Sequence, residues 1–239
     1  MIFISSVLIA NRADLLPGVL VRRYRRFITD VRLGDGTVVT AHTPNTGSMM
    51  QCAVPGHAVL VSRSHNPVRK LPFTLELIRV KGRWVDTHTH RANRVVEEAL
   101  RGGKIEGLEG WSVIPEQRFN KSRFDFRLEN HGRLAFLEVK NSTLICGPHT
   151  ACFPDAVTTR GQKHLADLEN AVKAGHRAMV LFLVQRSEAR AFTPADHIDP
   201  EYGRLLRRAV KNGVEALACK TRIRPPYISL GRRIPVVLD

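Results

Sequence analysis

Short apolar runs separated by turn-forming residues fill the first third of the chain. Clusters of Gly, Pro, Asn and Asp between the runs predict tight turns. The pattern predicts a small OB-like β-barrel, because closing a sheet of short strands removes its exposed edges and leaves the loops free for binding. The runs with the length and composition of strands cover residues 19–21, 27–33, 37–41, 58–61 and 74–80.

A different pattern begins after Trp84, where apolar residues at 95, 96, 99 and 100 form a helical stripe that two glycines end. The elements predicted in this region are a helix over 91–100, an antiparallel meander over 111–119, 122–128 and 134–144 with turns at 120–121 and 130–132, helices over 157–174 and 200–212, and strands over 178–184 and 214–219. This order predicts a mixed sheet flanked by helices. We therefore expect two domains, the barrel over residues 1–83 and an α/β domain over residues 84–239.

The charge of the chain favours a polyanionic partner. Its 239 residues include 37 Lys and Arg against 22 Asp and Glu, a formal net charge of +15 at pH 7. Such a field attracts phosphates at a distance, so nucleic acid is the first candidate, and a basic surface that only aids solubility is the alternative. The first 83 residues hold twelve basic and four acidic side chains. The predicted barrel is therefore the denser electrostatic footprint.

The cysteines and the first residues bear on the compartment. Cysteines stand at positions 52, 146, 152 and 219, include no CxxC pair and are too few for a disulfide framework. We therefore expect reduced thiols and a cytoplasmic protein. The apolar residues 1–10 lack a basic leading segment and are shorter than a membrane span, so they predict a first strand or an upstream-start extension, and no membrane partner is expected.

Two carboxylates and a lysine in the predicted meander carry the main chemical signal. Glu138 and Lys140 have the spacing of strand residues that share one face, and Asp125 on the preceding strand faces Glu138 if the register allows. Two such carboxylates make a hard-oxygen site for Mg²⁺ or Mn²⁺. In phosphodiester hydrolysis the lysine would orient water or stabilise developing charge.

The spacing D-x12-E-x-K matches that of PD-(D/E)xK nucleases, with Phe124 in place of the proline. The alternative is an ion-paired, solvated strand face. Helical periodicity leaves Glu97 and Glu98 on opposite flanks of the helix over 91–100 and does not choose between them. Glu116 on the first strand of the meander is a further candidate. For each, a plain surface carboxylate is the alternative.

Basic and polar segments supply candidate nucleic-acid contacts. Residues 22–27 interleave four arginines with two aromatic rings, which offers phosphate contacts beside stacking faces, and Phe27 is expected in the core. The loop at 44–48 and the start of the helix over 157–174 offer amides and hydroxyls to anions. A solvated edge strand, an ordinary loop and routine helix capping are the alternatives. The predicted contacts are Arg22, Arg23, Tyr24, Arg25, Arg26, Asn45, Thr46, Ser48, Arg69, Lys70, Arg123, Thr158, Arg160, Gln162 and Lys163.

Longer motifs resemble those of the sugar fermentation stimulation protein A family. The resemblance runs from about Leu20 to the C-terminus. The motifs that carry it are RYRRF (23–27), DV (30–31), PNTGSM (44–49), SRFDF (122–126), EVK (138–140), FPDAVT (153–158) and RGQKHL (160–165). The resemblance implies an N-terminal OB-type domain joined to a PD-(D/E)xK nuclease-like α/β domain, DNA binding, and a link to the regulation of sugar-utilisation genes.

The resemblance also implies site residues. It places the acidic residues of the family at Glu98, Glu116, Asp125 and Glu138 and its lysine at Lys140; of these, Asp125, Glu138 and Glu116 are the predicted metal ligands. We therefore predict a Mg²⁺- or Mn²⁺-dependent nuclease acting on DNA, with RNA left open. A non-catalytic DNA-binding regulator of sugar (maltose-type) metabolism genes is the alternative.

Two histidines depart from the pattern of the family. His88 stands where the family has asparagine, and with His90 it forms a His-x-His pair. A structural zinc ion needs four ligands, and only two are in view here. The pair therefore gives no more than a weak indication of zinc, and its role is left open.

Overall fold

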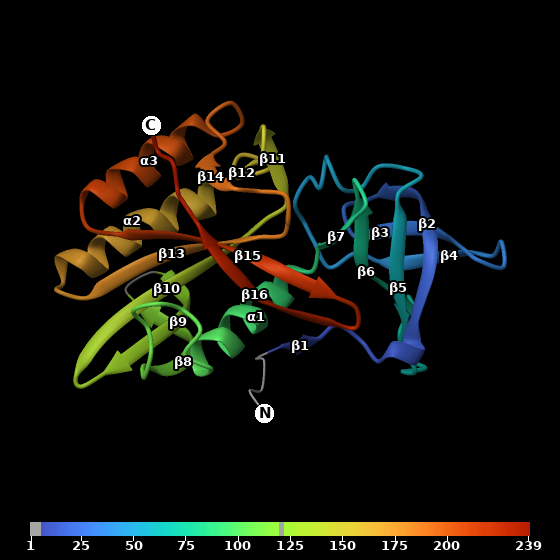
Figure 1. The fold of residues 1–239 in the computed structure, drawn as a ribbon, viewed down its shortest axis with the longest axis horizontal. Helices are drawn as coiled ribbons and strands as arrows, with labels where there is room; N and C mark the ends of the chain where they lie inside the picture. The colour runs from blue at the N-terminus through green and yellow to red at the C-terminus, as the bar shows by residue number, and fades with distance from the viewer. Residues whose placement is uncertain (1–5, 120–121) are drawn as a thin grey trace.

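The computed structural model describes residues 6–119 and 122–239. The turn predicted at residues 120–121 lies outside this part of the chain. The described residues form an N-terminal barrel and a larger α/β domain (Figure 1). No helix in the described ranges is long and apolar enough to cross a membrane.

The N-terminal residues form the OB barrel that the alternating runs predict. Its sheet has the order β4-β3-β2-β5-β6-β7, and parallel pairing of β4 with β6 closes five of the strands on themselves. Apolar side chains from alternate positions, among them Leu20, Val31, Val61 and Leu75, fill the interior. The bounds are β2 (Leu15–Tyr24), β3 (Ile28–Leu33), β4 (Val38–His42), β5 (Ala58–Arg63), β6 (Phe73–Val80) and β7 (Arg83–Asp86).

A seven-stranded sheet forms the centre of the α/β domain, in the order β1-β16-β15-β13-β10-β9-β8. The central strands β10, β13 and β15 are parallel, and β8, β9 and β10 form the predicted antiparallel meander. The bounds are β1 (Val7–Leu8), β8 (Ser112–Phe119), β9 (Ser122–Asn130), β10 (Arg133–Ser142), β13 (Arg177–Val184), β15 (Glu215–Arg224) and β16 (Tyr227–Ile234). This mixed sheet agrees with the predicted fold class.

Helices cover both faces of this sheet (Figure 1). Helix α1 (Thr89–Arg101) packs on one face, and α2 (Thr159–Lys173) and α3 (Pro200–Lys211) pack on the other. Residues 178–184 of β13 are buried throughout, with alternate side chains joining the two cores. The unbroken apolar run therefore predicts this central strand correctly, because a strand covered on both faces needs apolar residues at every position.

The prediction of four reduced thiols is wrong, because a small third sheet contains a disulfide. This sheet consists of β11 (Leu144–Gly147), β12 (Thr150–Phe153) and β14 (Ala191–Pro194). Cys146 and Cys152 form a disulfide across the β11–β12 hairpin, whereas Cys52 and Cys219 are free and buried. The hairpin brings two cysteines six positions apart to a Cα separation of 5.9 Å, which spacing rules based on CxxC do not detect.

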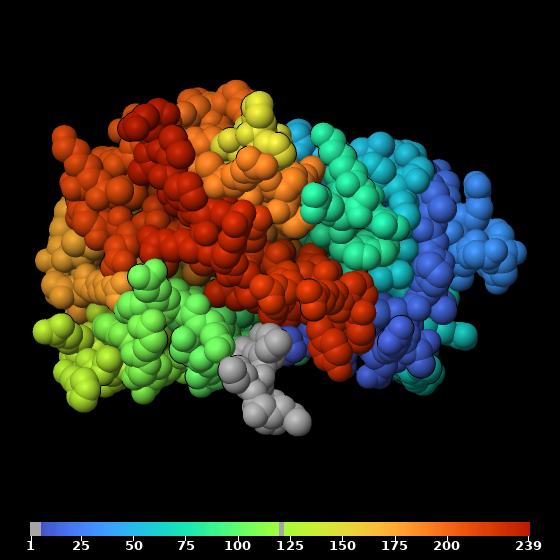
Figure 2. Space-filling model, viewed as in Figure 1, coloured from blue at the N-terminus to red at the C-terminus, as the bar shows by residue number. Residues whose placement is uncertain are grey.

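The division of the strands between the two sheets differs slightly from the predicted boundary at residue 83. Strand β7 continues the barrel sheet to Asp86, and β1 pairs with β16 in the sheet of the α/β domain. Figure 2 shows the barrel packed directly against the larger domain. Arg91 of α1 links the domains, because its buried guanidinium donates to carboxylates of Glu76 in β6 and Asp86 in β7.

Candidate active site

The three residues of the D-x12-E-x-K pattern meet where β9 and β10 separate. Phe126 pairs with Leu137 in this ladder, so the next position along each strand brings Asp125 opposite Glu138. Here the N–H of Val139 donates to a side chain and not to the backbone of β9: its acceptor is Oδ2 of Asp125, at 2.7 Å. The register that the predicted site requires is therefore present.

Glu138 and Lys140 both project toward α2. Oε1 of Glu138 accepts hydrogen bonds from Nζ of Lys140 at 2.7 Å and from Nδ1 of His164 in α2. Because Nδ1 donates to a carboxylate, the fitting neutral tautomer keeps its lone pair on Nε2, where Nε of Arg160 lies 3.4 Å away. An ammonium carries three donors, so Lys140 retains N–H groups beyond the one that it gives to Glu138.

The Asp125 carboxylate resists ionisation in its present surroundings. Burial raises the pKa of Asp125 to about 6, and the negative charge of Glu138 adds to the rise. Hydrogen bonds from the N–H of Val139 and, at 2.7 Å, from Nδ2 of Asn93 in α1 oppose this pKa shift. A cation bound between the two carboxylates would favour the ionised form of Asp125, because it would offset the repulsion from Glu138.

Glu138 has the opposite pKa shift. Burial by itself raises its pKa, but the hydrogen bond from His164 and the charge of Lys140 together lower it. Its second oxygen, Oε2, is buried and has no hydrogen-bond partner among the described residues. Such an oxygen is costly to bury unless a ligand satisfies it. With the Asp125 carboxylate it offers the hard oxygen donors that Mg²⁺ and Mn²⁺ accept, and these ions commonly take water and phosphate oxygens as further ligands.

A cleft of about 340 Å³ over these residues is shared by the two domains. The barrel contributes the loop at 45–47, and the α/β domain contributes the carboxylates, Lys140 and the start of α2. Asp155 fixes the loop: Oγ of Ser48 donates to its carbonyl at 2.8 Å, and the N–H of Met49 donates to its Oδ2 at 3.1 Å. A Cβ at Gly47 would lie 2.8 Å from the same Oδ2, so a side chain here would displace the Asp155 carboxylate.

Two predicted acidic residues lie away from the cleft. Glu98 is exposed on α1, and Glu116 in β8 lies 3.4 Å from Arg123 in β9 with both side chains mostly exposed. Helix α1 presents Asn93 to Asp125 instead; residues five apart on a helix point about 140° away from each other, which turns Glu98 elsewhere. No group of three or more His, Cys, Asp or Glu side chains within residues 6–119 and 122–239 is arranged to hold a metal.

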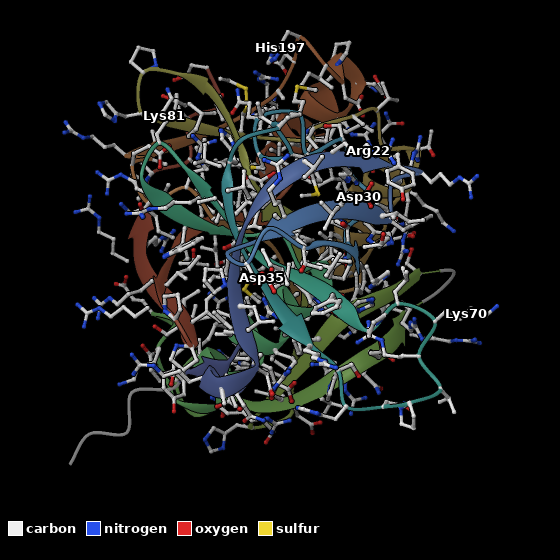
Figure 3. All side chains as sticks on the ribbon, turned by 90° about the vertical axis from the view of Figure 1, so that its right-hand side faces the viewer. Arg22, Asp30, Asp35, Lys70, Lys81 and His197 are labelled. Carbon is white, nitrogen blue, oxygen red and sulfur yellow. A yellow bond between two sulfur atoms is a disulfide. The ribbon has the colours of Figure 1, made fainter. Side chains whose placement is uncertain are left out.

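The arginine-rich segment of the barrel is partly engaged in internal bonds. Arg22 pairs with Asp30 at 2.7 Å (Figure 3) and stacks over the ring of Tyr24. Arg23 donates to the backbone carbonyls of residues 45, 47 and 48, which braces the loop beside the cleft. Asn45 also acts within this loop, since its side chain bonds to the backbone of residues 47 and 87.

The end of this segment differs from the predicted strand. Arg25 and Arg26 have φ values of 48° and 61°, and two successive left-handed residues turn the chain after Tyr24. Phe27, expected in the core, is 46% exposed for this reason. Arg25 and Arg26 line a hollow of about 420 Å³ with Thr46 and have no ion-pair partner in the described part of the chain. These two guanidinium groups remain available to an anion.

The start of α2 contributes two of its four predicted residues to the cleft. Thr158 and Arg160 line it, and Oγ1 of Thr158 also caps the helix by accepting a backbone N–H at 3.1 Å. Gln162 instead binds the carboxylate of Asp199 at 2.9 Å, and Lys163 is exposed outside the cleft lining. Lys70 extends from its loop away from the body of the molecule (Figure 3). Arg69, by contrast, lines a second hollow together with the two histidines of the His-x-His pair.

Comparison with known proteins matches both domains. A family model described as "SfsA N-terminal OB domain" matches residues 21–86, and one described as "Sugar fermentation stimulation protein RE domain" matches residues 90–227. The chain belongs to the SfsA family. The resemblance drawn from the sequence motifs is thereby confirmed, and the two matched ranges meet close to the end of β7.

Relatives of this SfsA-family chain match it over nearly its whole length. A sugar fermentation stimulation protein homolog of Syntrophotalea carbinolica is 65% identical over 227 residues, 95% of this chain and 98% of the relative. A homolog of Geobacter sulfurreducens is 52% identical over 225 residues, 93% and 96% of the two chains. The solved structure of Pyrococcus furiosus SfsA in complex with Ca²⁺ is 25% identical with a TM-score of 0.87 and covers 97% of this chain and 99% of that chain.

Sequence reasoning missed His164 and Asn93 in this SfsA-family site. The signal for His164 was weak: it precedes Leu165 on the apolar side of α2, where a buried polar ring needs a partner. Asn93 gives no signal of its own, because its spacing from Asp125 in the sequence carries no geometric information. Only the placement of α1 beside β9 brings the side chain of Asn93 to that of Asp125.

Proposed function

We propose that this chain hydrolyses nucleic-acid phosphodiesters with the help of a divalent cation, in the cleft between the barrel and the α/β domain. The observation that supports this most directly is the convergence of Asp125, Glu138 and Lys140, with a buried Glu138 oxygen that lacks a donor among the described residues. Hard oxygen atoms beside an ammonium group are the components that phosphodiester hydrolysis requires.

Asp125 and Glu138 would hold the cation. The chemistry that such a cation supplies is charge neutralisation on the phosphate and a lower pKa of the attacking water. The Ca²⁺ complex of Pyrococcus furiosus SfsA supports a cation site in the family, and Ca²⁺ takes the same class of oxygen donors as Mg²⁺.

The side chains around the carboxylates have separate tasks. Lys140 directs its remaining N–H donors into the cleft, where they would hold a phosphate oxygen or orient water. His164 fixes one oxygen of Glu138, which leaves the other oxygen for the cation. Asn93 holds Asp125 in the same way from the opposite helix. Both act as positioning residues, because each bonds to a carboxylate that would hold the cation.

Nucleic acid is the substrate class that the charges favour. The chain carries a formal net charge of +15, and Arg25 and Arg26 in the barrel and Arg160 beside the cleft offer guanidinium groups to phosphates. The resemblance of the sequence motifs to a family described as binding DNA favours DNA over RNA. Such a substrate fits the cytoplasm as the place of action.

The test compares the wild-type chain with Lys140→Ala and Asp125→Ala on linear, nicked and single-stranded DNA and on RNA, with Mg²⁺ and with Mn²⁺. We expect wild-type cleavage of at least one substrate, and a loss on the order of 10²–10³-fold in each variant, because each removes a group that stabilises the transition state. Lys211→Gln, an exposed lysine at the end of α3, is the matched control and should cleave normally. A wild-type chain that is inert toward every substrate would refute the proposal.

A non-catalytic DNA-binding role is the second candidate. The observation in its favour is that, of the four predicted acidic residues, Glu98 and Glu116 lie away from the cleft and Asp125 and Glu138 line it. This alternative expects that wild-type protein binds DNA without cleaving it, and that Asp125→Ala and Lys140→Ala change neither the DNA affinity nor the cellular phenotype.

A further inference from the structure

A second hollow, of about 490 Å³, adjoins the cleft at the start of α1. His90 lines both spaces, and the barrel loop that contributes residues 45–47 to the cleft contributes Pro44 to this hollow. The other residues that give it its character are His42 and Arg69 from the barrel and His88 and Arg94 from the start of the α/β domain. We call this hollow the histidine–arginine pocket.

Positive charge exceeds negative charge in this pocket. Its carboxylate, Glu76, and the neighbouring Asp86 are both bonded to the guanidinium of Arg91, so their charge is already engaged. The guanidinium of Arg69 bonds to the hydroxyl of Thr74, at 2.9 Å. Neither Arg69 nor Arg94 has a carboxylate within ion-pair distance among the residues that the structure describes. Two guanidinium groups at the rim of one hollow are thus available to an anion.

The pKa values of two histidines in the pocket reflect the same excess of positive charge. Burial lowers the pKa of His88 to about 3, and the positive charges of Arg91, His90, His42 and Arg94 lower it further. Burial and Arg69 lower the pKa of His42 as well. Nδ1 of His88 is buried and has no hydrogen-bond partner in residues 6–119 and 122–239. An anion in the pocket would offset the contribution of the positive charges to these pKa shifts, because a nearby negative charge favours protonated imidazole.

Because three histidines line the pocket, a metal ion is the alternative to an anion as its ligand. Within the described ranges, the histidines of the pocket do not form a group that could hold one. His88 and His90 lie with ring centroids 6.2 Å apart in an edge-on arrangement. The pocket therefore offers hydrogen-bond donors and cationic groups, the combination that recognises phosphate.

We propose that the histidine–arginine pocket is a subsite for a phosphate group of the nucleic-acid strand that occupies the cleft, at a position away from the scissile phosphate. His90 lines both spaces, so the pocket lies beside the cleft and a strand that passes over His90 would reach both. The inference rests on the proposed function and adds a determinant of how the strand is held. Arg69 and Arg94 bind the phosphate, and His88 and His90 form part of the wall around it.

The test measures the affinity of short DNA oligonucleotides in EDTA, which prevents cleavage, by fluorescence anisotropy. Each probe carries one neutral methylphosphonate in place of one phosphate, and the neutral group is moved along the strand. The variant is Arg69→Gln/Arg94→Gln. The control is Lys173→Gln/Lys211→Gln, which removes the same charge from exposed ends of α2 and α3.

We expect wild-type protein to lose affinity on the order of tenfold when one particular phosphate is neutral, because a charge-assisted contact is lost. In the arginine variant the unmodified probe should bind about tenfold more weakly, and neutralising that phosphate should have little further effect. The lysine control should retain the wild-type dependence on probe position. Equal position dependence in wild type and arginine variant overturns the subsite, and so does a wild-type chain that binds no probe in EDTA. Both outcomes leave the proposed hydrolysis intact, because the cleavage assay with Mg²⁺ and Mn²⁺ tests it separately.

Discussion

The side-chain amide of Asn93 donates to Oδ1 of Asp125 at 2.7 Å and so ties α1 to β9 beside the cleft. A neutral donor at this position stabilises the ionised carboxylate, which burial and Glu138 disfavour. The amide also fixes the direction in which Asp125 presents its oxygens. The helix thereby supports the proposed metal site without contributing a charge to it.

Replacing this amide should weaken cation binding. In Asn93→Ala the pKa of Asp125 should rise above its value of about 6, and Mn²⁺ affinity at neutral pH, measured by calorimetry, should fall about 10-fold or more. Asn170→Ala, which truncates an exposed asparagine in α2, is the control and should bind Mn²⁺ as wild type does. Equal affinity in Asn93→Ala and wild type would show that the amide does not support the site.

The buried charge of Asp125 should make the site a source of instability. Its pKa of about 6 in the folded chain lies above the ordinary value of 3.8, so the folded state holds its proton more tightly than the unfolded state. Stability then falls as pH rises from 4 to 6, and the cost is complete above that window. Asp125→Asn should therefore be more stable than wild type at neutral pH by about 1–3 kcal/mol, while activity is lost.

Urea denaturation across the pH range checks this prediction. The free energies of unfolding of wild type and Asp125→Asn should converge below the ordinary pKa of 3.8, where both side chains are neutral. Saturating Mg²⁺ should also narrow the gap at neutral pH, because it binds only the folded wild-type site. A gap that is constant at every pH would exclude the buried charge as its cause.

The meander shows how far strand periodicity can predict a site. Alternation along residues 138–140 places Glu138 and Lys140 on one face, and the antiparallel hairpin brings Asp125 opposite Glu138. Both follow from local rules of period and pairing. The sequence therefore predicts these three residues together, although it leaves the solvated alternative open until the cleft above them is known.

The remaining neighbours of the site depend on packing between distant segments. Which side of α1 faces β9 follows from the way the helix is set on the sheet, so periodicity cannot select Asn93 over Glu98. His164 and Asp155 are brought to the site by the docking of α2 and of the barrel loop. The disulfide between Cys146 and Cys152 is missed for a related reason, since it depends on a short hairpin over residues 144–153, where the sequence predicts no hairpin.

His164 should act through Glu138. His164→Ala removes the Nδ1 donor to Oε1, so Mn²⁺ affinity and cleavage rate should fall about 10–100-fold, the usual effect of losing a group that orients a metal ligand. His164→Gln retains an N–H donor and should recover part of both losses. If alanine and glutamine reduce Mn²⁺ affinity equally, the hydrogen bond is not the property that matters.

The link between the domains should be the most sensitive point for stability. Arg91 is 4% exposed and bonds to buried carboxylates from two barrel strands. Arg91→Met leaves Glu76 and Asp86 without their cation, so the free energy of unfolding should fall by about 3–5 kcal/mol. Adding Glu76→Gln and Asp86→Asn to this variant should restore part of the loss, because neutral amides are cheaper to bury than unpaired carboxylates.

An exposed pair provides the contrast for this prediction. Arg204 and Glu201 in α3 form an ion pair at 2.7 Å with side chains 60% and 48% exposed, and Arg204→Met should leave the urea midpoint unchanged because solvent screens such pairs. The comparison contrasts a buried arginine that pairs with two carboxylates of another domain with an exposed arginine that pairs with one carboxylate of its own helix. If Arg91→Met shifts the midpoint no more than Arg204→Met does, the barrel and the α/β domain are held together by their apolar contacts and loop bonds alone.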